Sequence, residues 1–364
     1  MLTFDDMNLL RRDYRMLKVA VIGTGLIATL KHLPAWKRAK DFARVVALCD
    51  VDIEQAAKVA AKFGIQNTYA NTREMYDKER PDIVDVCTPP KTHKTLTVEA
   101  LDAGSHVLLE KPMATSVAEC DEILAAAQRV NRKVCLAHSD LFYPAFMKAR
   151  ELLESGKVGP LAGMRIFLST PVDYITSKPD HWAHKLRGGV LGETGPHVVY
   201  MTLAFIKPIR HIQIHAQKLL KDYPWSPFED YRITLAGESA VSSIALTYAT
   251  RHWAAQLEIW GRDGIITADL ESQAVTLYRR GELKPVDVGV STVKVAADLV
   301  RTAASAGLDL ATRRYQTTHD LLIQKFSASV RDNTPAPVPP EDGRESIRVL
   351  DLLMEDLEKD AVRS

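Results

Sequence analysis

The chain has 364 residues, of which 46% are hydrophobic and 26% charged, and its 47 basic and 46 acidic side chains leave a formal net charge of +1. A chain of this length exceeds one comfortable core and fits two domains. The even charge balance argues against a nucleic-acid or membrane-surface partner, because either would require a basic excess. We therefore expect a small-molecule partner.

The lack of a recognisable targeting signal and the pattern of cysteines indicate a cytoplasmic protein. No eighteen apolar residues run together, and the charged first fifteen residues contain no apolar stretch of signal-peptide length, so neither export nor membrane insertion is expected. The four cysteines are scattered without a Cys-x-x-Cys pair, which is typical of reduced core residues, and we expect no metal site. They are Cys49, Cys87, Cys120 and Cys135.

Residues 19–30 form the most informative stretch, because an apolar run ends in two closely spaced glycines and leads into a helical pattern. Gly23 would let the backbone turn sharply, and Gly25 would let a pyrophosphate approach closely. Ala28 fills the small position where the helix packs on the strand. The phosphates would then lie on the helix N-terminus. The residues predicted to bind a dinucleotide at this turn are Gly23, Thr24, Gly25, Leu26 and Ile27.

A second apolar run ends in Asp50, 22 residues after Ala28. A carboxylate at this offset accepts hydrogen bonds from the adenosine ribose hydroxyls and repels a 2′-phosphate. The next residues, Val51 and Asp52, offer no positive charge, so NAD is favoured over NADP as the cofactor. The alternative, that Asp50 caps the following helix, suits Asp52 better.

The first half of the chain alternates strand and helix patterns, and its strands are apolar throughout, which predicts a parallel sheet buried on both faces. Predicted strands occupy residues 45–50, 83–88, 107–110 and 134–138, and predicted helices occupy 53–63, 92–103 and 116–129. Ligands of such sheets bind beyond the carboxyl ends of the strands. The residues at those ends are Gly23–Ile27, Asp50, Thr88–Pro90, Glu110–Pro112 and His138.

The second half changes to a periodicity of two, which predicts an antiparallel-rich sheet. The predicted strands are 162–169, 209–217, 231–235, 239–248, 255–260, 265–269 and 274–279. Predicted helices occupy 144–155, 313–332 and 343–359, while the stretch before residue 313 is unassigned. The predicted organisation is an extension (1–16), a dinucleotide-binding domain (17–140) and a second domain (141–364).

Two further motifs make the chain resemble the Gfo/Idh/MocA oxidoreductases over about residues 17–140. They are Cys-Thr-Pro-Pro-Lys-Thr-His at 87–93 and Glu-Lys-Pro at 110–112. The resemblance implies an α/β Rossmann domain that binds NAD(P), followed by an α+β domain with an open, largely antiparallel sheet. The second domain of that family often makes subunit contacts, so the resemblance also implies a homodimer or homotetramer.

The resemblance also assigns roles in the first domain. Thr88 and Pro89 would line the nicotinamide end of the site, and Lys111 would reach the reacting centre. A lysine at a strand's carboxyl end can donate to a substrate oxygen and stabilise the developing alkoxide. Glu110 and His93 would lie beside the cofactor, His93 as a packing residue and not as a proton carrier.

In the second domain, the run 188–200 is expected to hold the acid–base chemistry. Pro196 indicates the first turn of a helix, which would place His197 at the positive end of the helix dipole and favour a neutral ring. By resemblance His197 is the general acid/base, and Glu193 takes the position usually held by Asp. Tyr200 replaces a frequent acid, and Leu141-Phe142 replaces an Arg-Phe pair. Because the resemblance implies that these positions and Glu193 contact the substrate, we expect a substrate other than the family's well-known sugars and inositols. Further candidate pocket residues are His181, Trp182, Lys185, Arg187 and Tyr200.

These observations predict an NAD-dependent oxidoreductase that interconverts a secondary alcohol and a ketone on a sugar, polyol or related polar molecule. In oxidation His197 would accept the hydroxyl proton while Lys111 stabilises the oxygen and Glu193 holds His197 or a substrate hydroxyl. Two alternatives remain open: a regulator that binds the dinucleotide without catalysis, and an enzyme that keeps and recycles a tightly bound NAD.

Overall fold

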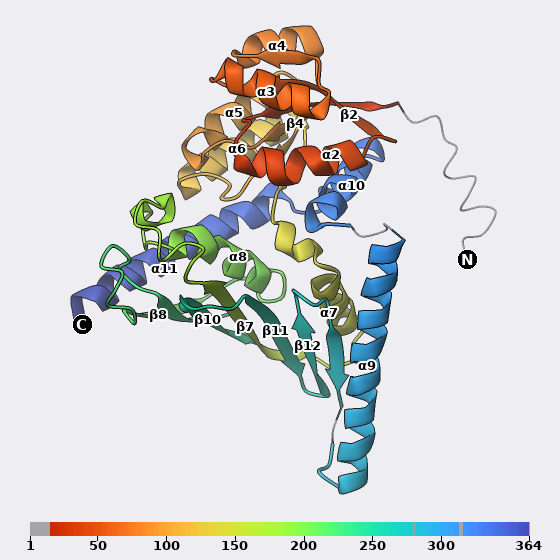
Figure 1. Ribbon diagram of the computed structural model, residues 1–364, viewed down its shortest axis with the longest axis vertical. Coiled ribbons are helices and arrows are strands. Elements are labelled where there is room, and N and C mark those ends of the chain that lie inside the picture. Colours follow the sequence, from red (N-terminus) through yellow and green to blue (C-terminus); the bar gives the residue numbers. More distant parts are fainter. Residues whose placement is uncertain (1–14, 280, 313–315, 364) are drawn as a thin grey trace, which may run out of the picture. The chain divides into compact units, whose positions relative to one another are not determined.

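The computed structural model describes residues 15–279, 281–312 and 316–363 (Figure 1). Most of the predicted extension, residues 1–14, lies outside the described residues. The chain divides into two compact units, one containing the residues up to Ala137 together with His319–Arg344, the other His138–Thr318 together with Glu345–Ser364. The sequence pattern had assigned all of 141–364 to one domain, whereas residues 319–344 belong with the first unit by contact.

The first unit is built on a six-stranded parallel sheet with the strand order β3-β2-β1-β4-β5-β6. This is the Rossmann order, and right-handed crossovers that leave β1 in one direction and β4 in the other put helices on both faces. The strands are β1 (Leu17–Ile22), β2 (Ala43–Cys49), β3 (Asn67–Tyr69), β4 (Ile83–Val86), β5 (His106–Leu109) and β6 (Val134–Leu136). The predicted parallel sheet is therefore confirmed.

Several helices of this unit begin at a capping side chain that the sequence pattern indicates. Asp52 accepts a hydrogen bond from the Gln55 N–H at the start of α3, and Ser116 accepts one from Glu119 at the start of α6. The helices are α2 (Leu33–Arg38), α3 (Ile53–Phe63), α4 (Thr72–Glu79), α5 (Pro90–Asp102), α6 (Val117–Val130) and α10 (Thr318–Arg331), with a short π-helix, η1 (Ala28–His32), before α2. Helix α10 was predicted from residue 313; residues 313–315 lie outside the described part of the chain.

Strand β3 and helix α4 were missed by the sequence analysis. Strand β3 has only three residues, which is too short for a hydrophobic period to show. Helix α4 has few apolar residues, but Asn71 caps it by accepting from the Glu74 N–H. That Asn-x-x-Glu spacing is the signal that could have revealed the helix.

The second unit contains a seven-stranded sheet in the order β13-β12-β11-β7-β10-β9-β8. Strands β7 and β10 pair in parallel and the other neighbours pair antiparallel, which confirms the predicted, largely antiparallel sheet. The strands are β7 (Leu161–Pro171), β8 (His211–Gln217), β9 (Asp230–Ala236), β10 (Val241–Thr250), β11 (Ala254–Gly261), β12 (Gly264–Asp269) and β13 (Val275–Tyr278).

One face of this sheet is the core of the second unit. The pairing register aligns one apolar residue from every strand into a continuous row across the sheet. The row is Val275, Ala268, Leu257, Ile166, Ile244, Ile233 and Ile214. Helices α7 (Pro144–Glu154), α8 (Leu191–Leu203) and α11 (Pro340–Arg363) contribute buried residues to the same core. The alternation of the strands is thus explained, because every second residue packs against these helices.

The predicted start of the helix that carries His197 is wrong. Helix α8 begins at Leu191, and Pro196 is its sixth residue. The turn before the helix is made by Gly188 and Gly189, whose φ angles of +72° and +61° suit glycine. His197 therefore lies in the second turn, beyond the free N–H groups of the helix start, so the proposed effect of the helix dipole on its ring is not supported.

Two further helices differ from the prediction. Helix α9 (Pro285–Ala311) fills the unassigned stretch before residue 313, and α11 begins at Pro340 instead of 343. Figure 1 shows α9 as the long helix at the β12–β13 edge of its sheet. Within the described residues, no helix is both long and apolar enough to span a membrane.

Candidate active site

The glycine turn directly follows β1 and has the geometry that a dinucleotide site requires. Gly23 has a φ of +91°, and a Cβ there would lie 2.5 Å from the carbonyl oxygen of Cys87. Gly25 is exposed, and a Cβ there would meet nothing within 4 Å. Gly23 is therefore required by the fold, whereas Gly25 leaves open space that a ligand can occupy. Ala28 is fully buried at the start of η1, in the small-residue position.

Asp50 lies at the carboxyl end of β2, and the turn itself holds its carboxylate. One oxygen accepts from the N–H and the hydroxyl of Thr24, both at 2.7 Å, and the other accepts from the Asp52 N–H at 3.0 Å. Asp50 remains partly exposed, and each carboxylate oxygen can accept further bonds. The turn thus orients an acid that still has acceptor capacity for a ribose.

His93 connects the two motif loops at the ends of β4 and β5. Its Nε2 lies 2.7 Å from the Thr88 carbonyl oxygen, and its Nδ1 lies 2.8 Å from that of Pro112. Burial lowers the pKa of His93, although its carbonyl contacts act in the opposite sense. A fully buried ring held between two carbonyls is a structural link between the loops.

A network of buried charges lies beneath the Glu-Lys-Pro loop, and the sequence analysis missed its centre, His32. The ring of His32 is fully buried between two carboxylates, with Nδ1 2.9 Å from Asp85 and Nε2 2.7 Å from Glu110. Trp36 donates its indole N–H to Asp85 at 2.7 Å. The other oxygen of Glu110 accepts the backbone N–H of Lys111 at 3.0 Å. His32 thereby connects the helix after the glycine turn to the backbone of the predicted catalytic lysine.

The electrostatics of this network indicate a charged histidine. Burial alone would lower the pKa of His32, but the charge and hydrogen bond of Asp85 raise it well above its usual value. Burial would raise the pKa of Glu110, but its hydrogen bond to His32 and the nearby positive groups lower it to about 2. An imidazolium can donate from both nitrogens, which is what two flanking carboxylates require. His319 of α10 stacks edge-on against His32 at 5.2 Å.

A large surface hollow of about 1040 Å³ lies at the opposite end of this sheet. Its lining includes Leu17, Asp82 and His106, which lie at the amino ends of β1, β4 and β5. Ligands of doubly wound sheets bind at the carboxyl ends instead. The hollow is therefore separate from the candidate site.

In the second unit, His197 contacts a carboxylate that the sequence analysis did not assign. Its Nδ1 lies 2.7 Å from Oδ2 of Asp140 and 2.8 Å from the hydroxyl of Tyr200. Tyr200 is buried and also accepts from the Asp140 N–H at 3.4 Å, and its ring stacks on His138 at 4.3 Å. Because an ionised carboxylate only accepts, Nδ1 carries a proton, and in the singly protonated form of the ring Nε2 keeps its lone pair. The His197 and Asp140 side chains are 23% and 21% exposed, so solvent reaches the pair.

The other predicted site residues of this unit lie on or before helix α8. Arg187 is held by α11, donating to both oxygens of Glu358 at 2.8 and 3.1 Å. Trp182 and Lys185 lie on the short 3₁₀ helix η3 (Trp182–Lys185), where Trp182 is 54% exposed. Glu193 lies on α8 one turn before His197. Burial lowers the pKa of His181 while the charge of Glu193 acts in the opposite sense, so the η3 loop lies near the start of α8.

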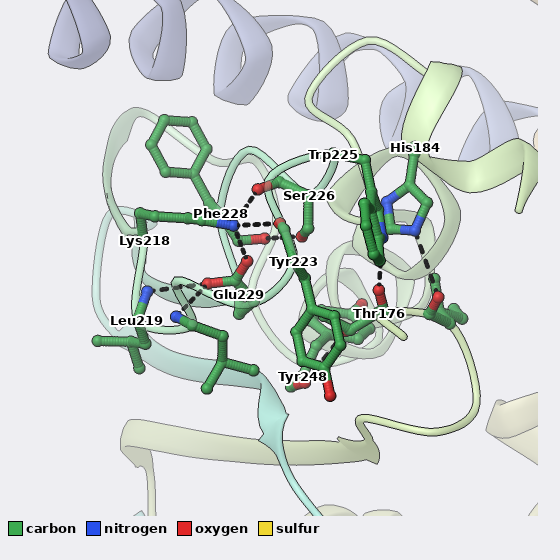
Figure 2. Close-up of polar contacts among 12 residues, drawn as sticks. Thr176, His184, Lys218, Leu219, Tyr223, Trp225, Ser226, Phe228, Glu229 and Tyr248 are labelled. Atoms are coloured by element: carbon green, nitrogen blue, oxygen red, sulfur yellow. Dashed lines mark hydrogen bonds and ion pairs between the residues drawn. The ribbon is translucent and has the colours of Figure 1, made fainter. Parts of the chain in front are cut away.

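The loops around the start of α8 are braced by an ion pair whose carboxylate is buried (Figure 2). Glu229 is fully buried and accepts from the ammonium of Lys218 at 2.7 Å and from the N–H groups of Leu219 and Leu220. In the same region Trp225 donates its indole N–H to the Thr176 carbonyl at 2.8 Å. The loop of residues 218–229 is thus tied both to itself and to the segment that leads into η3.

The two units define a Rossmann-type dinucleotide-binding protein with a second α+β unit that carries a carboxylate-oriented histidine. The family model described as "Oxidoreductase family, NAD-binding Rossmann fold" matches residues 17–138, and "GFO/IDH/MocA C-terminal domain" matches 146–267. The chain belongs to the Gfo/Idh/MocA oxidoreductase family, as the sequence motifs predicted.

Sugar and polyol dehydrogenases are among its relatives. The chain is 30% identical to D-apiose dehydrogenase of Paraburkholderia graminis over 162 residues, 44% of this chain and 43% of that protein. It is 23% identical to myo-inositol 2-dehydrogenase of Thermotoga maritima, over 90% of this chain and 92% of that protein. The fold resembles the WlbA dehydrogenase of Bordetella pertussis, solved with NADH and UDP-GlcNAcA (TM-score 0.75, 18% identity, 95% of this chain and 96% of that one).

The two glycines of the turn should separate folding from cofactor binding. Gly23→Ala should lower the thermal midpoint by several degrees, because the Cβ strains a positive φ and collides with backbone; such strain costs about 1–3 kcal/mol. Gly25→Ala should keep the wild-type midpoint but weaken NAD binding about tenfold or more, because its Cβ takes the space that the pyrophosphate needs. Scanning fluorimetry and NAD titration measure the two effects. Unchanged NAD affinity in Gly25→Ala would show that no phosphate approaches this residue.

The His32 network should give the first unit a characteristic pH dependence. The contribution of Glu110 is present above its usual pKa of 4.5 and is lost as the pH falls toward its folded pKa of about 2. The contribution of His32 is fully present below its usual pKa of 6.5 and is lost as the pH rises through its raised folded pKa. The network should therefore stabilise the fold most between about pH 4.5 and 6.5.

Removing the central charge tests this network directly. His32→Leu should lower the free energy of unfolding by about 3–5 kcal/mol at pH 5.5, because two buried carboxylates lose the positive charge between them. The triple variant His32→Leu/Asp85→Asn/Glu110→Gln is the matched control and should recover much of the loss. Urea unfolding measures both. A single variant as stable as the wild type would mean that His32 is not charged in the folded protein.

Proposed function

We propose that this protein is an NAD-dependent oxidoreductase that interconverts a secondary alcohol and a ketone on a sugar, a polyol or a related polar small molecule. The observation that carries the proposal is the Asp140–His197 pair, since a buried packing histidine would not need an oriented carboxylate and a solvent-accessible ring. The sugar and polyol dehydrogenases among the relatives support the substrate class.

His197 is the proposed proton acceptor in the oxidation direction. The carboxylate of Asp140 fixes the proton on Nδ1, so the lone pair on Nε2 is available for the substrate hydroxyl. When Nε2 takes the proton, the same carboxylate stabilises the imidazolium that forms. Asp140 replaces Glu193 as the proposed partner of the ring, and Glu193 keeps the proposed role of contacting a substrate hydroxyl.

Lys111 is the proposed electrophilic partner of the substrate oxygen. Its backbone N–H is bound to Glu110, whose carboxylate is in turn held by His32. A lysine whose main chain is fixed in this way has only its side chain left to order when its ammonium donates to a substrate oxygen. The network beneath the loop is therefore proposed to position Lys111 rather than to take part in proton transfer.

The residues of the first unit fit a nicotinamide dinucleotide. Gly25 offers open space at the start of a helix, and Asp50 offers acceptor capacity at the end of β2. When bound, NAD supplies the acceptor for the hydride that leaves the alcohol carbon. NAD is proposed over NADP because the carboxylate of Asp50, which Thr24 holds in place, would repel a 2′-phosphate.

The cofactor preference is tested by titration. NAD should bind at least tenfold more tightly than NADP, which corresponds to about 1.4 kcal/mol. Asp50→Asn should narrow this difference, because it removes the negative charge but keeps an oxygen for Thr24. Isothermal titration of both cofactors against both proteins measures it. Equal affinities in the wild type, or tighter NADP binding, would overturn the assignment.

The acid–base assignment is tested on variants of the Asp140–His197 pair. A substrate is first found by screening a panel of polyols and aldoses for NADH formation by absorbance. His197→Asn and Asp140→Asn should each lower kcat by about 10²–10⁴ and leave NAD affinity unchanged, because each removes the oriented base. His211→Asn, an exposed histidine on β8, is the matched control. A His197→Asn variant with the parental rate would show that another residue is the base.

The same assays separate the two alternative functions. NAD binding without turnover on any alcohol would favour the regulator that binds the dinucleotide without catalysis. Stoichiometric cofactor that co-purifies with the protein would favour the enzyme that keeps and recycles its NAD.

A further inference from the structure

Helix α9 carries a continuous apolar stripe that faces away from its own unit. The helix has 27 residues, and the side of it that packs toward β13 is formed by its half-buried residues, spaced three and four apart. They are Val288, Ser291, Val295, Asp298 and Thr302. The opposite side is exposed, and it carries residues with the same spacing. We define this outward stripe as Val286, Val290, Val293, Ala297, Val300 and Ala304, with Leu308 at its end.

The stripe is large and strongly exposed. Val286, Val293 and Val300 are 73%, 69% and 70% exposed, and Leu308 is 62% exposed. At 1.5 Å per residue the stripe is about 33 Å long, and with the width of a helix it covers about 300 Å². The largest apolar patch on a typical soluble monomer is about this size and is often functional.

The spacing of the stripe specifies the kind of partner. Successive members are separated by 4, 3, 4, 3 and 4 residues, which is the a/d spacing of a two-stranded coiled coil. Such a stripe packs best against a helix with the same period. A membrane surface does not fit, because a membrane-lying helix needs a polar face rich in lysine and arginine and usually aromatic anchors. Helix α9 contains Lys294 and Arg301 together with Asp287 and Asp298, so its polar face is not rich in basic residues, and it has no aromatic residue.

We propose that the partner is the same stripe on a second copy of this chain, in an antiparallel, two-fold contact between the two α9 helices. With residue 295 near the two-fold axis, each valine meets a valine or a small residue of the other copy: Val286 meets Ala304, Val290 meets Val300, and Val293 meets Ala297. Antiparallel pairing also brings Asp287 of each copy close to Arg301 of the other at both ends. Lys294 of the two copies meet near the middle, the one like-charge contact of this register. A two-fold contact is satisfied by one self-complementary surface, which this stripe is.

Two adjacent exposed positions provide a matched test. Val293 lies on the stripe, and Thr292 is exposed on the same turn but about 100° away around the helix. Sedimentation velocity across a concentration series should show a dimer, or a larger even-numbered assembly, for the wild type. Val293→Asp should weaken the association at least tenfold, whereas Thr292→Asp should leave it unchanged. Circular dichroism and the thermal midpoint establish that both variants are folded.

A thiol-protection experiment tests the same surface without introducing a buried charge. All four native cysteines are buried, so an added surface cysteine is the readily accessible thiol. In purified protein, Val293→Cys should react with maleimide at least tenfold more slowly than Thr292→Cys, and dilution below the dissociation constant should abolish the difference. A monomeric wild type at micromolar concentration, an oligomer that Val293→Asp leaves intact, or equal labelling of the two cysteines would each overturn the proposal.

Discussion

The first unit depends on one buried charge, the imidazolium of His32 held between Asp85 and Glu110. Removing three charges from water is costly, and the cost is offset because both ring nitrogens and all four carboxylate oxygens have hydrogen-bond partners. The three residues come from η1, β4 and the end of β5, so the contact joins the helix after the glycine turn to two loops that carry family motifs. A hydrophobic core alone would pack these elements but would not fix the loop of Lys111 relative to the turn.

In the second unit, the side chains of His197 and Asp140 are oriented without a buried charge network. This proposed acid–base pair is partly exposed, and the surrounding elements orient it. Tyr200 and His197 share one face of α8, Asp140 comes from the short 3₁₀ helix η2 (Ser139–Phe142) after β6, and the stacked ring of His138 supports Tyr200. The double-glycine turn and the braced loop 218–229 determine where α8 starts. Tyr200 occupies a position where the family often has an acid. Here its hydroxyl contacts Nδ1 of His197 and accepts a hydrogen bond from the Asp140 N–H.

The sequence predicted most of the fold because its signals are local. Apolar runs, capping residues and glycine turns identify the strands and helices of both sheets, and motif spacing identified the family. The site was less predictable, since its decisive contacts join distant residues. Asp140 and His197 are 57 residues apart, and no sequence motif links them. The available signal is that Asp140 lies two residues after His138, at a predicted strand end where ligand-binding residues are expected.

Two other failures have specific physical causes. His32 is four residues after Ala28, where a regular helix pattern gives no reason to expect a buried charge; the π-helical turn is a tertiary feature. Helix α9 is apolar on several sides and contains β-branched residues and two internal glycines, so neither its propensity nor its period identifies it as a helix of a single globular chain. Its pattern becomes interpretable when a partner surface is considered.

The central claim is that this protein transfers a hydride between NAD and a carbon of a polar small molecule, and isotope transfer tests it most directly. The protein would be incubated with NADH deuterated at nicotinamide C4 and a pool of keto-sugars and keto-inositols, and the products analysed by mass spectrometry. The account predicts an alcohol product that carries one deuterium on carbon, formed from one face of the nicotinamide only. Tight NADH binding with no deuterium transferred to any ketone in the pool would contradict it.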